Sequence, residues 1–294
     1  MNNEKEIIKA IGNLRGKTIV VKYGGAAMKS PELKDCVIKD ILSLKESEAD
    51  LVVVHGGGPE LSALQKQLGI ETRFVDGLRF TDAQTIDAAI MALCGKVNKD
   101  IVRMLEKEGQ RAVGISGIDG SIIGCKKQKE PDLGYVGEII WIKKELIDIL
   151  LGGGIVPVIS TVGIGEDGSA FNVNADTAAG RIAASLNADY FITLSDIPGV
   201  LRDVNDPTSL IVEMDESESE KMIETGVISG GMIPKIRGIT NAIKHGARSA
   251  SIIDGRVPHS LLFALAERVA SERGDKLEGG TQLVGTTIKE TNKK

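Results

Sequence analysis

The sequence predicts an α/β protein built as a three-layer αβα sandwich, with a central sheet that is mainly parallel. Two observations predict this fold. Short runs of β-branched residues alternate with segments of helical period, as in proteins made of repeated strand–helix units. The runs are apolar at nearly every position, which is typical of strands buried on both faces of a parallel sheet. The strands expected in this sheet are residues 18–23, 51–55, 112–116, 155–160, 190–195 and 250–254.

Helices are expected between these strands. The first begins at Pro31, because Ser30 can cap it and Glu32 suits the positive end of its dipole. Two segments, 120–141 and 163–173, lack helical period, so we expect short antiparallel strands at an edge of the sheet, with a hairpin turn at 166–169. The polar tail after Gly285 is expected to fray. Further helical periodicity covers 82–108, 175–186, 221–225 and 234–245.

One domain with two lobes is expected over residues 17–294, an N-terminal lobe to about residue 186 and a C-terminal lobe from about residue 187. Segment 1–16 is predicted to form an amphipathic helix, because its apolar residues fall on one face: Ile7, Ile8, Ile11 and Leu14. An exposed apolar stripe would be a liability. We therefore expect it to pack against a partner subunit; the alternative is that it folds onto its own domain.

The composition excludes several classes of protein. The 36 basic and 41 acidic residues give a net charge of -5, which offers no general attraction for nucleic acid or an anionic membrane. Aromatic residues make up only 3%, too few for base-stacking platforms. No apolar stretch approaches the ~18 residues that span a bilayer, and the first residues lack the apolar core of a signal peptide, so we expect a cytoplasmic protein.

Three glycine-rich stretches resemble known fingerprints without meeting their requirements. Residues 12–18 lack one residue between the glycines of a P-loop and precede a strand instead of following one. Residues 163–168 match GxGxxG but do not lead into an apolar helix, which favours a hairpin over a dinucleotide site. The HGGG stretch at 55–58 also occurs in esterases, but no GxSxG motif accompanies it.

Better candidates for a functional site lie where the predicted strands end. Lys22 stands at the tip of the first strand, just before Gly24 and Gly25, whose bare backbone can approach an anion. The second strand runs into Gly57 and Gly58 at the start of a helix, where unpaired N–H groups and the helix dipole favour an anion. The alternative for these glycines is a tight turn with no ligand.

Polar side chains recur at two later junctions. Arg79 precedes a helix and suits bidentate capture of a carboxylate, with a surface ion pair as the alternative. Asn172, Asn174 and Asp176 alternate in an extended segment that enters a helix, so all three point to one face and Asp176 lies near the positive helix end. A helix cap would need only one of them, which favours a polar site.

The last motif places a cation where the helix dipole opposes it. Gly230 and Gly231 precede a helix whose first turn holds Lys235, a position disfavoured by roughly 0.3–1 kcal/mol unless an anion such as a phosphate lies nearby. Upstream, the loop at 194–201 contains Gly199 and suits a flat ring or a ribose.

Together the motifs describe two anion cradles, each with its own lysine, with one aspartate and no histidine base. This set favours phosphoryl transfer, which depends on positioning and charge stabilisation.

Six stretches occur in an order that resembles the amino acid kinase family, and within it the members that phosphorylate N-acetyl-L-glutamate: VVKYGGAAM, VVVHGGGPE, GLRFTD, FNVNADTAA, LSDIPGVL and SGGMIPK. The resemblance runs from about residue 17 to residue 284. It implies ATP-dependent phosphorylation of the γ-carboxylate of N-acetyl-L-glutamate, the second step of arginine biosynthesis. Lys22 and Lys235 would stabilise the transferring phosphoryl group, and Asp176 would organise both lysines.

The resemblance also implies the ligand contacts. Gly57 and Gly58 would hold the reacting carboxylate and Arg79 the α-carboxylate. Asn172 would bind the acetamido and α-carboxylate end, with Asn174 as a further substrate contact. No protein-held metal is expected, because no acidic pair stands out. ATP, with Mg²⁺ on its phosphates, would contact Gly24, Gly25, Leu194, Ser195, Asp196, Gly199, Gly230, Gly231 and Met232.

The resemblance adds to the expectation of assembly that the apolar stripe of segment 1–16 raises, and it alone implies regulation. Arginine-inhibited members of the family interlace an N-terminal helix between dimers, so we expect a homo-oligomer, either a dimer or a hexamer built as a trimer of dimers, with arginine as a feedback inhibitor. Residues 271–284 depart from the pattern of those members by being longer and more charged. The alternatives are a kinase of the same family for glutamate, aspartate, carbamate or a nucleotide monophosphate, and a non-catalytic amino-acid sensor. The neutral asparagines disfavour a free amine, and the presence of both lysines with Asp176 disfavours a sensor.

Overall fold

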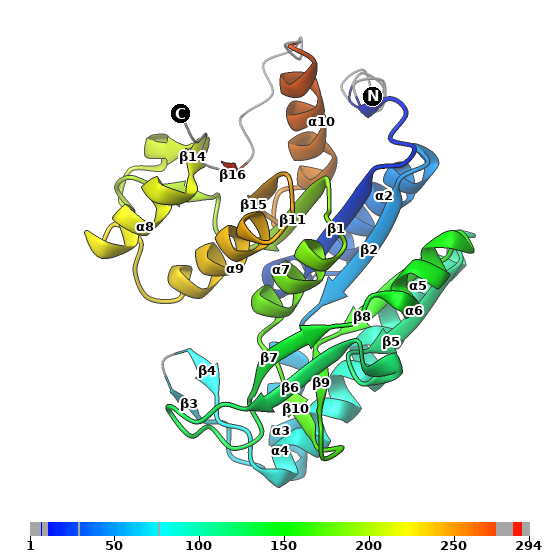
Figure 1. Ribbon diagram of the computed structural model, residues 1–294, viewed down its shortest axis with the longest axis vertical. Helices are drawn as coiled ribbons and strands as arrows, with labels where there is room; N and C mark the ends of the chain where they lie inside the picture. The colour runs from blue at the N-terminus through cyan, green and yellow to red at the C-terminus, as the bar shows by residue number, and fades with distance from the viewer. Residues whose placement is uncertain (1–6, 8–10, 29, 76, 275–284, 290–294) are drawn as a thin grey trace.

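The structure is a computed structural model that describes residues 7, 11–28, 30–75, 77–274 and 285–289. Its centre is an 8-stranded sheet in the order β14–β16–β15–β11–β1–β2–β8–β5 (Figure 1). The mainly parallel sheet that the sequence predicts is confirmed. The strands that run parallel are β1 (Thr18–Tyr23), β2 (Asp50–His55), β5 (Ala112–Ser116), β8 (Val156–Ser160), β11 (Tyr190–Ser195) and β15 (Ala250–Asp254).

Helices cover both faces of this sheet, which gives the three predicted layers. Alternate residues of β1 point to opposite faces: Ile19 and Val21 join one hydrophobic cluster, and Val20 joins the other. The face of Ile19 is covered by α2 (Pro31–Glu46), α5 (Asn98–Lys107) and α10 (Ser260–Arg273). The face of Val20 is covered by α6 (Glu145–Gly152), α7 (Ala175–Ser185), α8 (Glu216–Glu224) and α9 (Met232–Lys244).

Of the helices that the structure describes, none is both long and apolar enough to cross a membrane.

A 4-stranded sheet, β10–β9–β6–β7, lies beyond the carboxyl ends of β1 and β2 (Figure 1). The turn at residues 166–169 joins two of its strands as an antiparallel pair, as predicted. The helical segment predicted over 82–108 is formed by α4, a π-helical stretch at Ile90–Val97 and α5. The elements in this part of the molecule are α3 (Gly58–Leu68), β3 (Phe74–Val75), β4 (Leu78–Arg79), α4 (Ala83–Ala89), β6 (Ile123–Lys127), β7 (Gly137–Ile142), β9 (Val162–Gly165) and β10 (Ala170–Asn172).

The prediction that the tail after Gly285 frays is wrong for its described residues, 286–289. Thr286–Lys289 forms β16, which pairs with β15 and with β14 (Glu213–Asp215) inside the central sheet. The Thr286 hydroxyl accepts a hydrogen bond from Val200 N at 2.8 Å and donates one to Ile211 O at 2.6 Å, which ties the hairpin of β12 (Val200–Leu201) and β13 (Leu210–Ile211) to β16. Polar groups satisfied in this way can be buried, so the polar composition of the tail was a misleading signal.

The described residues of the apolar stripe near the N-terminus pack on their own domain. Ile7, Ile11 and Leu14 are 4%, 2% and 2% exposed, and they belong to the hydrophobic cluster that contains residues of α2 and α10. These three side chains lie as the alternative expects, and packing of the predicted helix against a partner subunit stays a prediction. The rest of the predicted helix over 1–16, including Ile8, lies largely outside the described residues.

Helices α7 and α9 cross at two glycines. A Cβ atom at Gly180 would lie 2.4 Å from Gly238 O, and a Cβ atom at Gly238 would lie 3.0 Å from Asp176 O. Only glycine lets the two backbones come this close. The crossing therefore sets the distance between the first turn of α7, which holds Asp176, and the first turns of α9, which hold Lys235.

We expect Gly180→Ala to lower the free energy of unfolding by about 1–3 kcal/mol, because the added methyl group forces α7 and α9 apart. The matched control is Gly152→Ala in the last turn of α6, where no described atom lies within 4 Å of the added carbon. The control should change stability by less than about 1 kcal/mol. Urea unfolding measures both; a Gly180→Ala protein as stable as the wild type would contradict the close crossing.

Candidate active site

The predicted site residues gather at the carboxyl ends of the parallel strands. Gly24 follows β1 and Gly56 follows β2, and a Cβ atom at Gly24 would lie 3.6 Å from both Gly56 N and Lys22 Nζ. The loop after β11 begins with Asp196 and reaches Lys235 at the start of α9. Open α/β sheets bind ligands at this edge, where glycine-rich loops expose backbone N–H groups.

Lys22 points to the face of the sheet that α7 covers, because it lies two residues after Val20. Its side chain is only 9% exposed, and Nζ lies 3.0 Å from Asp176 Oδ1. Asp176 is in the first turn of α7, where the helix dipole stabilises its negative charge. The contact is an ion pair without the alignment of a hydrogen bond, so the ammonium group keeps N–H donors for a ligand.

Lys235 is held by two groups that end β11 and begin the next loop. Its ammonium donates to Ser195 Oγ at 2.8 Å and lies 3.0 Å from Asp196 Oδ1. The hydrogen bond from Lys235 holds the pKa of Asp196 below its ordinary value. The carboxylate offsets the cost of a cation at the positive end of a helix, a role for which the sequence alone suggests a phosphate.

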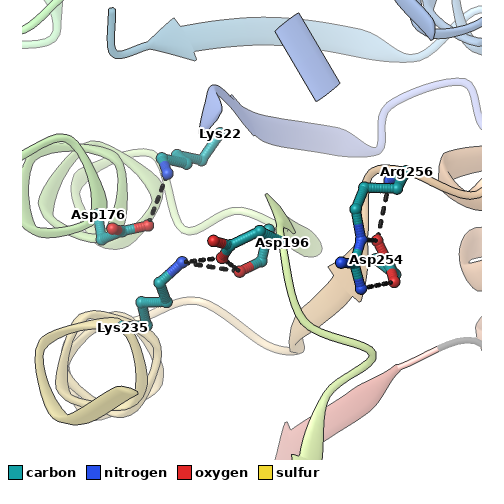
Figure 2. A network of polar contacts seen from close by, with 7 residues as sticks. Lys22, Asp176, Asp196, Lys235, Asp254 and Arg256 are labelled. Carbon is teal, nitrogen blue, oxygen red and sulfur yellow. Dashed lines mark hydrogen bonds and ion pairs between the residues drawn. The ribbon is translucent and has the colours of Figure 1, made fainter. Parts of the chain in front are cut away.

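The two lysines approach one region from opposite sides. Figure 2 shows Asp176 between the side chains of Lys22 and Lys235. The expected link from Asp176 to both lysines is present for Lys22 only, since Lys235 pairs with Asp196 instead. Each cation therefore has its own carboxylate, and the region between them can accept a polyanion that competes with those carboxylates.

The glycines near the lysines have an accessible backbone. Apart from the adjacent residues of the chain, no described atom lies within 4 Å of the Cβ position of Gly25, Gly230 or Gly231. Gly25 and Gly230 have φ angles of 60° and 55°, which side chains of L-residues rarely adopt. Successive N–H groups in turns of this kind form anion-binding concavities, as the sequence predicts for these loops.

A cavity of about 170 Å³ lies next to the loop that follows β2. None of the described residues that line it is acidic, so it suits an anion with a short aliphatic chain. Its lining contains every residue predicted to bind the acceptor substrate: Gly57, Gly58, Arg79, Asn172 and Asn174. The apolar part of its lining is Leu61, Phe74, Leu78, Leu93, Val136, Val173 and Ala175.

Arg79 is buried in the wall of this cavity, with 9% of its surface exposed. Its Nη2 donates to Gly58 O at 3.1 Å and to Ser62 Oγ at 2.8 Å, and its Nη1 donates to Gln65 Oε1. Burial lowers the pKa of Arg79, although arginine stays protonated in proteins. All three acceptors are neutral, so the positive charge remains available for an anionic ligand.

The side chains of Asn172 and Asn174 differ in the hydrogen bonds that they already make within the protein. Asn172 Nδ2 donates to Thr81 Oγ1 at 3.2 Å, and Thr81 donates in turn to Arg79 O at 2.9 Å, which connects Asn172 to β4. Asn174 is the N-cap of α7, and its Oδ1 accepts from two N–H groups of the first turn, each at 3.0 Å. Only the amide NH₂ of Asn174 is therefore left for a ligand.

Three residues predicted to contact the nucleotide take part in packing. Leu194 is fully buried in the hydrophobic core, so its side chain does not reach a ligand. Gly199 lies against β16, where a Cβ atom would be 2.6 Å from Thr286 Oγ1. Met232 packs against the core at the start of α9. Backbone contacts from these residues stay a prediction.

Sequence reasoning missed the residues that hold Arg79, above all Gln65. Gln65 is 0% exposed, accepts a hydrogen bond from Arg79 and donates one to Thr85 Oγ1 at 3.1 Å. A signal was available in the sequence, because Gln65 lies one helical turn after the apolar Leu61. A polar side chain on a buried helix face requires a buried partner.

Known proteins are similar in sequence to this chain over most of its length. The model of the amino acid kinase family matches residues 17–254. An acetylglutamate kinase from Caldanaerobacter subterraneus subsp. tengcongensis is 48% identical over 261 residues, which are 88% of this chain and 87% of that protein. The acetylglutamate kinase from Clostridioides difficile is 46% identical over 260 residues, with 88% and 91% covered. That from Thermosynechococcus vestitus is 48% identical over 250 residues, with 85% of each covered.

Solved structures share the fold at lower sequence identity. N-acetylglutamate synthase from Neisseria gonorrhoeae, complexed with coenzyme A and N-acetyl-glutamate, has a TM-score of 0.80 and 22% identity over 99% of this chain and 63% of that one. Carbamate kinase from Giardia lamblia, bound to AMP-PNP, has a TM-score of 0.67 and 16% identity over 94% of this chain and 99% of that one. The family model, the curated relatives and the ordered site motifs lead to one conclusion: the chain belongs to the amino acid kinase family.

Proposed function

We propose that the protein transfers the γ-phosphoryl group of ATP to the γ-carboxylate of N-acetyl-L-glutamate, which forms the acyl phosphate N-acetyl-L-glutamyl 5-phosphate. The observation that carries this proposal is the approach of Lys22 and Lys235 to one region, next to a cavity that Arg79 lines. The choice of acceptor is supported by curated relatives named acetylglutamate kinase. The reaction belongs to arginine biosynthesis.

The cavity supplies a partner for each polar group of N-acetyl-L-glutamate. The N–H groups of Gly57 and Gly58, at the start of α3, bind the reacting γ-carboxylate, and Arg79 binds the α-carboxylate. Asn172 binds the acetamido and α-carboxylate end, with the amide NH₂ of Asn174 as a further contact. Because the described lining has no acidic residue, a free α-ammonium group would lose its solvation without gaining a partner. This favours an acetylated amino acid over free glutamate or aspartate.

ATP is assigned to the C-terminal lobe, from about residue 187, and the acceptor to the N-terminal lobe before it. The γ-phosphate lies between Lys22 and Lys235, where it takes over the contact that Lys235 makes with Asp196. The remaining nucleotide contacts are assigned to Gly24, Gly25, Leu194, Ser195, Gly199, Gly230, Gly231 and Met232. Among the described residues no group of three or more His, Cys, Asp or Glu side chains forms a metal site. We therefore assign Mg²⁺ to the phosphates of ATP and its waters.

The transfer needs charge stabilisation more than proton movement. One oxygen of the γ-carboxylate attacks the γ-phosphorus in line, and the bond to the β–γ bridging oxygen breaks, so that its electron pair leaves on ADP. The acceptor is already an anion, so no general base is required and no proton moves. Lys22 and Lys235 neutralise charge on the oxygens of the phosphoryl group in transit, and Asp176 keeps Lys22 in place.

Assembly and feedback are part of the same proposal. We assign the protein a homo-oligomeric state, a dimer or a hexamer, and a cytoplasmic location. Free L-arginine is assigned as its inhibitor. Most of the segment 271–284, where the sequence departs from the arginine-inhibited members of the family, lies outside the described residues.

Release of ADP in a coupled assay tests the function directly. We expect turnover with N-acetyl-L-glutamate and a kcat/KM at least ~100-fold lower with glutamate, aspartate, carbamate or UMP, since each leaves charged or polar groups unpaired. Lys22→Ala serves as the control for contaminating kinases. Faster turnover with a free amino acid would contradict the choice of acceptor, and ligand binding without ADP release would identify a sensor.

Arg79→Ala should raise the KM for acetylglutamate by ~10–100-fold, the effect of losing a hydrogen-bonded charged partner. The KM for ATP should stay within about 2-fold, because Arg79 lines the cavity that is assigned to the acceptor. The control is Arg73→Ala, an arginine of the same hairpin region whose guanidinium stacks on Phe80 at 4.1 Å instead of lining the cavity. An unchanged KM for acetylglutamate would remove Arg79 from the substrate site.

A further inference from the structure

The imidazole of His55 is placed against the loop that binds the acceptor, although the proposed transfer gives it no chemical role. His55 is the last residue of β2 and is 0% exposed. Its Nδ1 lies 2.8 Å from the carbonyl oxygen of Gly56, and its Nε2 lies 3.0 Å from Nδ2 of Asn98, at the start of α5. A buried histidine with both ring nitrogens engaged is held in one orientation.

The surroundings of Asn98 decide which ring nitrogen carries the proton. Asn98 Nδ2 also lies 2.9 Å from Val158 O and 3.2 Å from Ile115 O. Carbonyl oxygens only accept hydrogen bonds, so the NH₂ group of Asn98 must face them and also face the imidazole. His55 Nε2 is then the acceptor, and the proton is on Nδ1, which donates to Gly56 O. Burial lowers the pKa of His55 to about 4, so the ring is neutral near pH 7.

The bond from Nδ1 orients the peptide group between Gly56 and Gly57. In a trans peptide the C=O and the N–H point in opposite directions. Holding Gly56 O on the imidazole therefore turns the N–H of Gly57 away from it, and both glycines line the cavity. The other side of Gly57 is closed, because a Cβ atom there would lie 2.7 Å from Leu93 and 3.0 Å from Val97.

We propose that His55, oriented by Asn98, is a positioning residue that holds the Gly56–Gly57 peptide so that the Gly57 N–H faces the reacting carboxylate. The inference rests on the proposed function, because it needs a carboxylate in this cavity. His55 acts only through the backbone and does not touch the substrate.

Two substitutions separate this role from packing. In His55→Asn the side-chain NH₂ stands where Nδ1 stands now, so it can still donate to Gly56 O. In His55→Gln the amide reaches the position of Nε2, which keeps the contact with Asn98 and leaves Gly56 O without its donor. We expect His55→Asn to keep the KM for acetylglutamate within about 3-fold and His55→Gln to raise it by about 10-fold. The KM for ATP should stay within about 2-fold in both variants.

A role in packing alone predicts the opposite order, since asparagine removes more volume from the core than glutamine. Thermal unfolding of both variants shows how far each loses stability. The proposal is overturned if the two variants have the same KM for acetylglutamate, or if His55→Asn has the higher one. It is also overturned if the KM for ATP rises together with the KM for acetylglutamate.

A measurement on the wild type keeps the proposal testable if the variants do not fold. The chain has 3 histidines, so ¹⁵N labelling of imidazole gives few resonances to assign. We expect His55 to be the neutral tautomer protonated on Nδ1 and to stay so down to pH 5.5. A proton on Nε2 of His55, or titration of this imidazole near pH 6.5, would overturn the proposal. Wild type that is inactive with acetylglutamate would refute the proposed function, whereas this tautomer test would still stand.

Discussion

The site depends on holding two lysine ammonium groups near one another without leaving their charges unpaired. Like charges repel strongly where water is partly excluded, so each cation requires a carboxylate before any ligand arrives. Lys22 has Asp176 at 3.0 Å, and Lys235 has Asp196 at 3.0 Å. The fold brings these four groups together through two features: β1 lies beside β11 in the sheet, and α7 crosses α9 closely. A polyphosphate can then replace carboxylate contacts instead of entering a region of bare positive charge.

The two halves of the site hold their cations in different ways, and the difference matches the ligand that we propose for each half. Arg79 is held by neutral acceptors, and no described carboxylate forms an ion pair with it, so its charge could pair with the carboxylate of a ligand. The two lysines are held by carboxylates, with which a phosphate would compete. In the proposed reaction the α-carboxylate of the substrate stays in place and would pair firmly with Arg79. The phosphoryl group moves, and after it has left, the lysines would pair again with Asp176 and Asp196, which favours turnover over tight product binding.

Local sequence patterns predicted much of this arrangement. The apolar run of β1 placed Lys22 at a strand end, and the run from Asn172 to Asp176 placed a carboxylate in the first turn of a helix. Contacts between distant segments escaped prediction because no local pattern encodes them. The pairing of Lys235 with Asp196 needs the strand order, and β16 needs the hydroxyl of Thr286 to find partners in β12 and β13. Tyr23, for which the sequence suggests no role, is a core residue, 1% exposed.

The central claim is that Lys22 and Lys235 act on the same phosphoryl group in transit. Calorimetric binding of ADP with aluminium fluoride, a mimic of that group, in the presence of Mg²⁺ and acetylglutamate, tests it most directly. Wild type should bind the mimic complex at least ~100-fold more tightly than ADP alone, as transition-state analogues do. Lys22→Ala and Lys235→Ala should each lose most of this gain while binding ADP within about 3-fold of wild type. A variant that keeps the full gain would contradict the account.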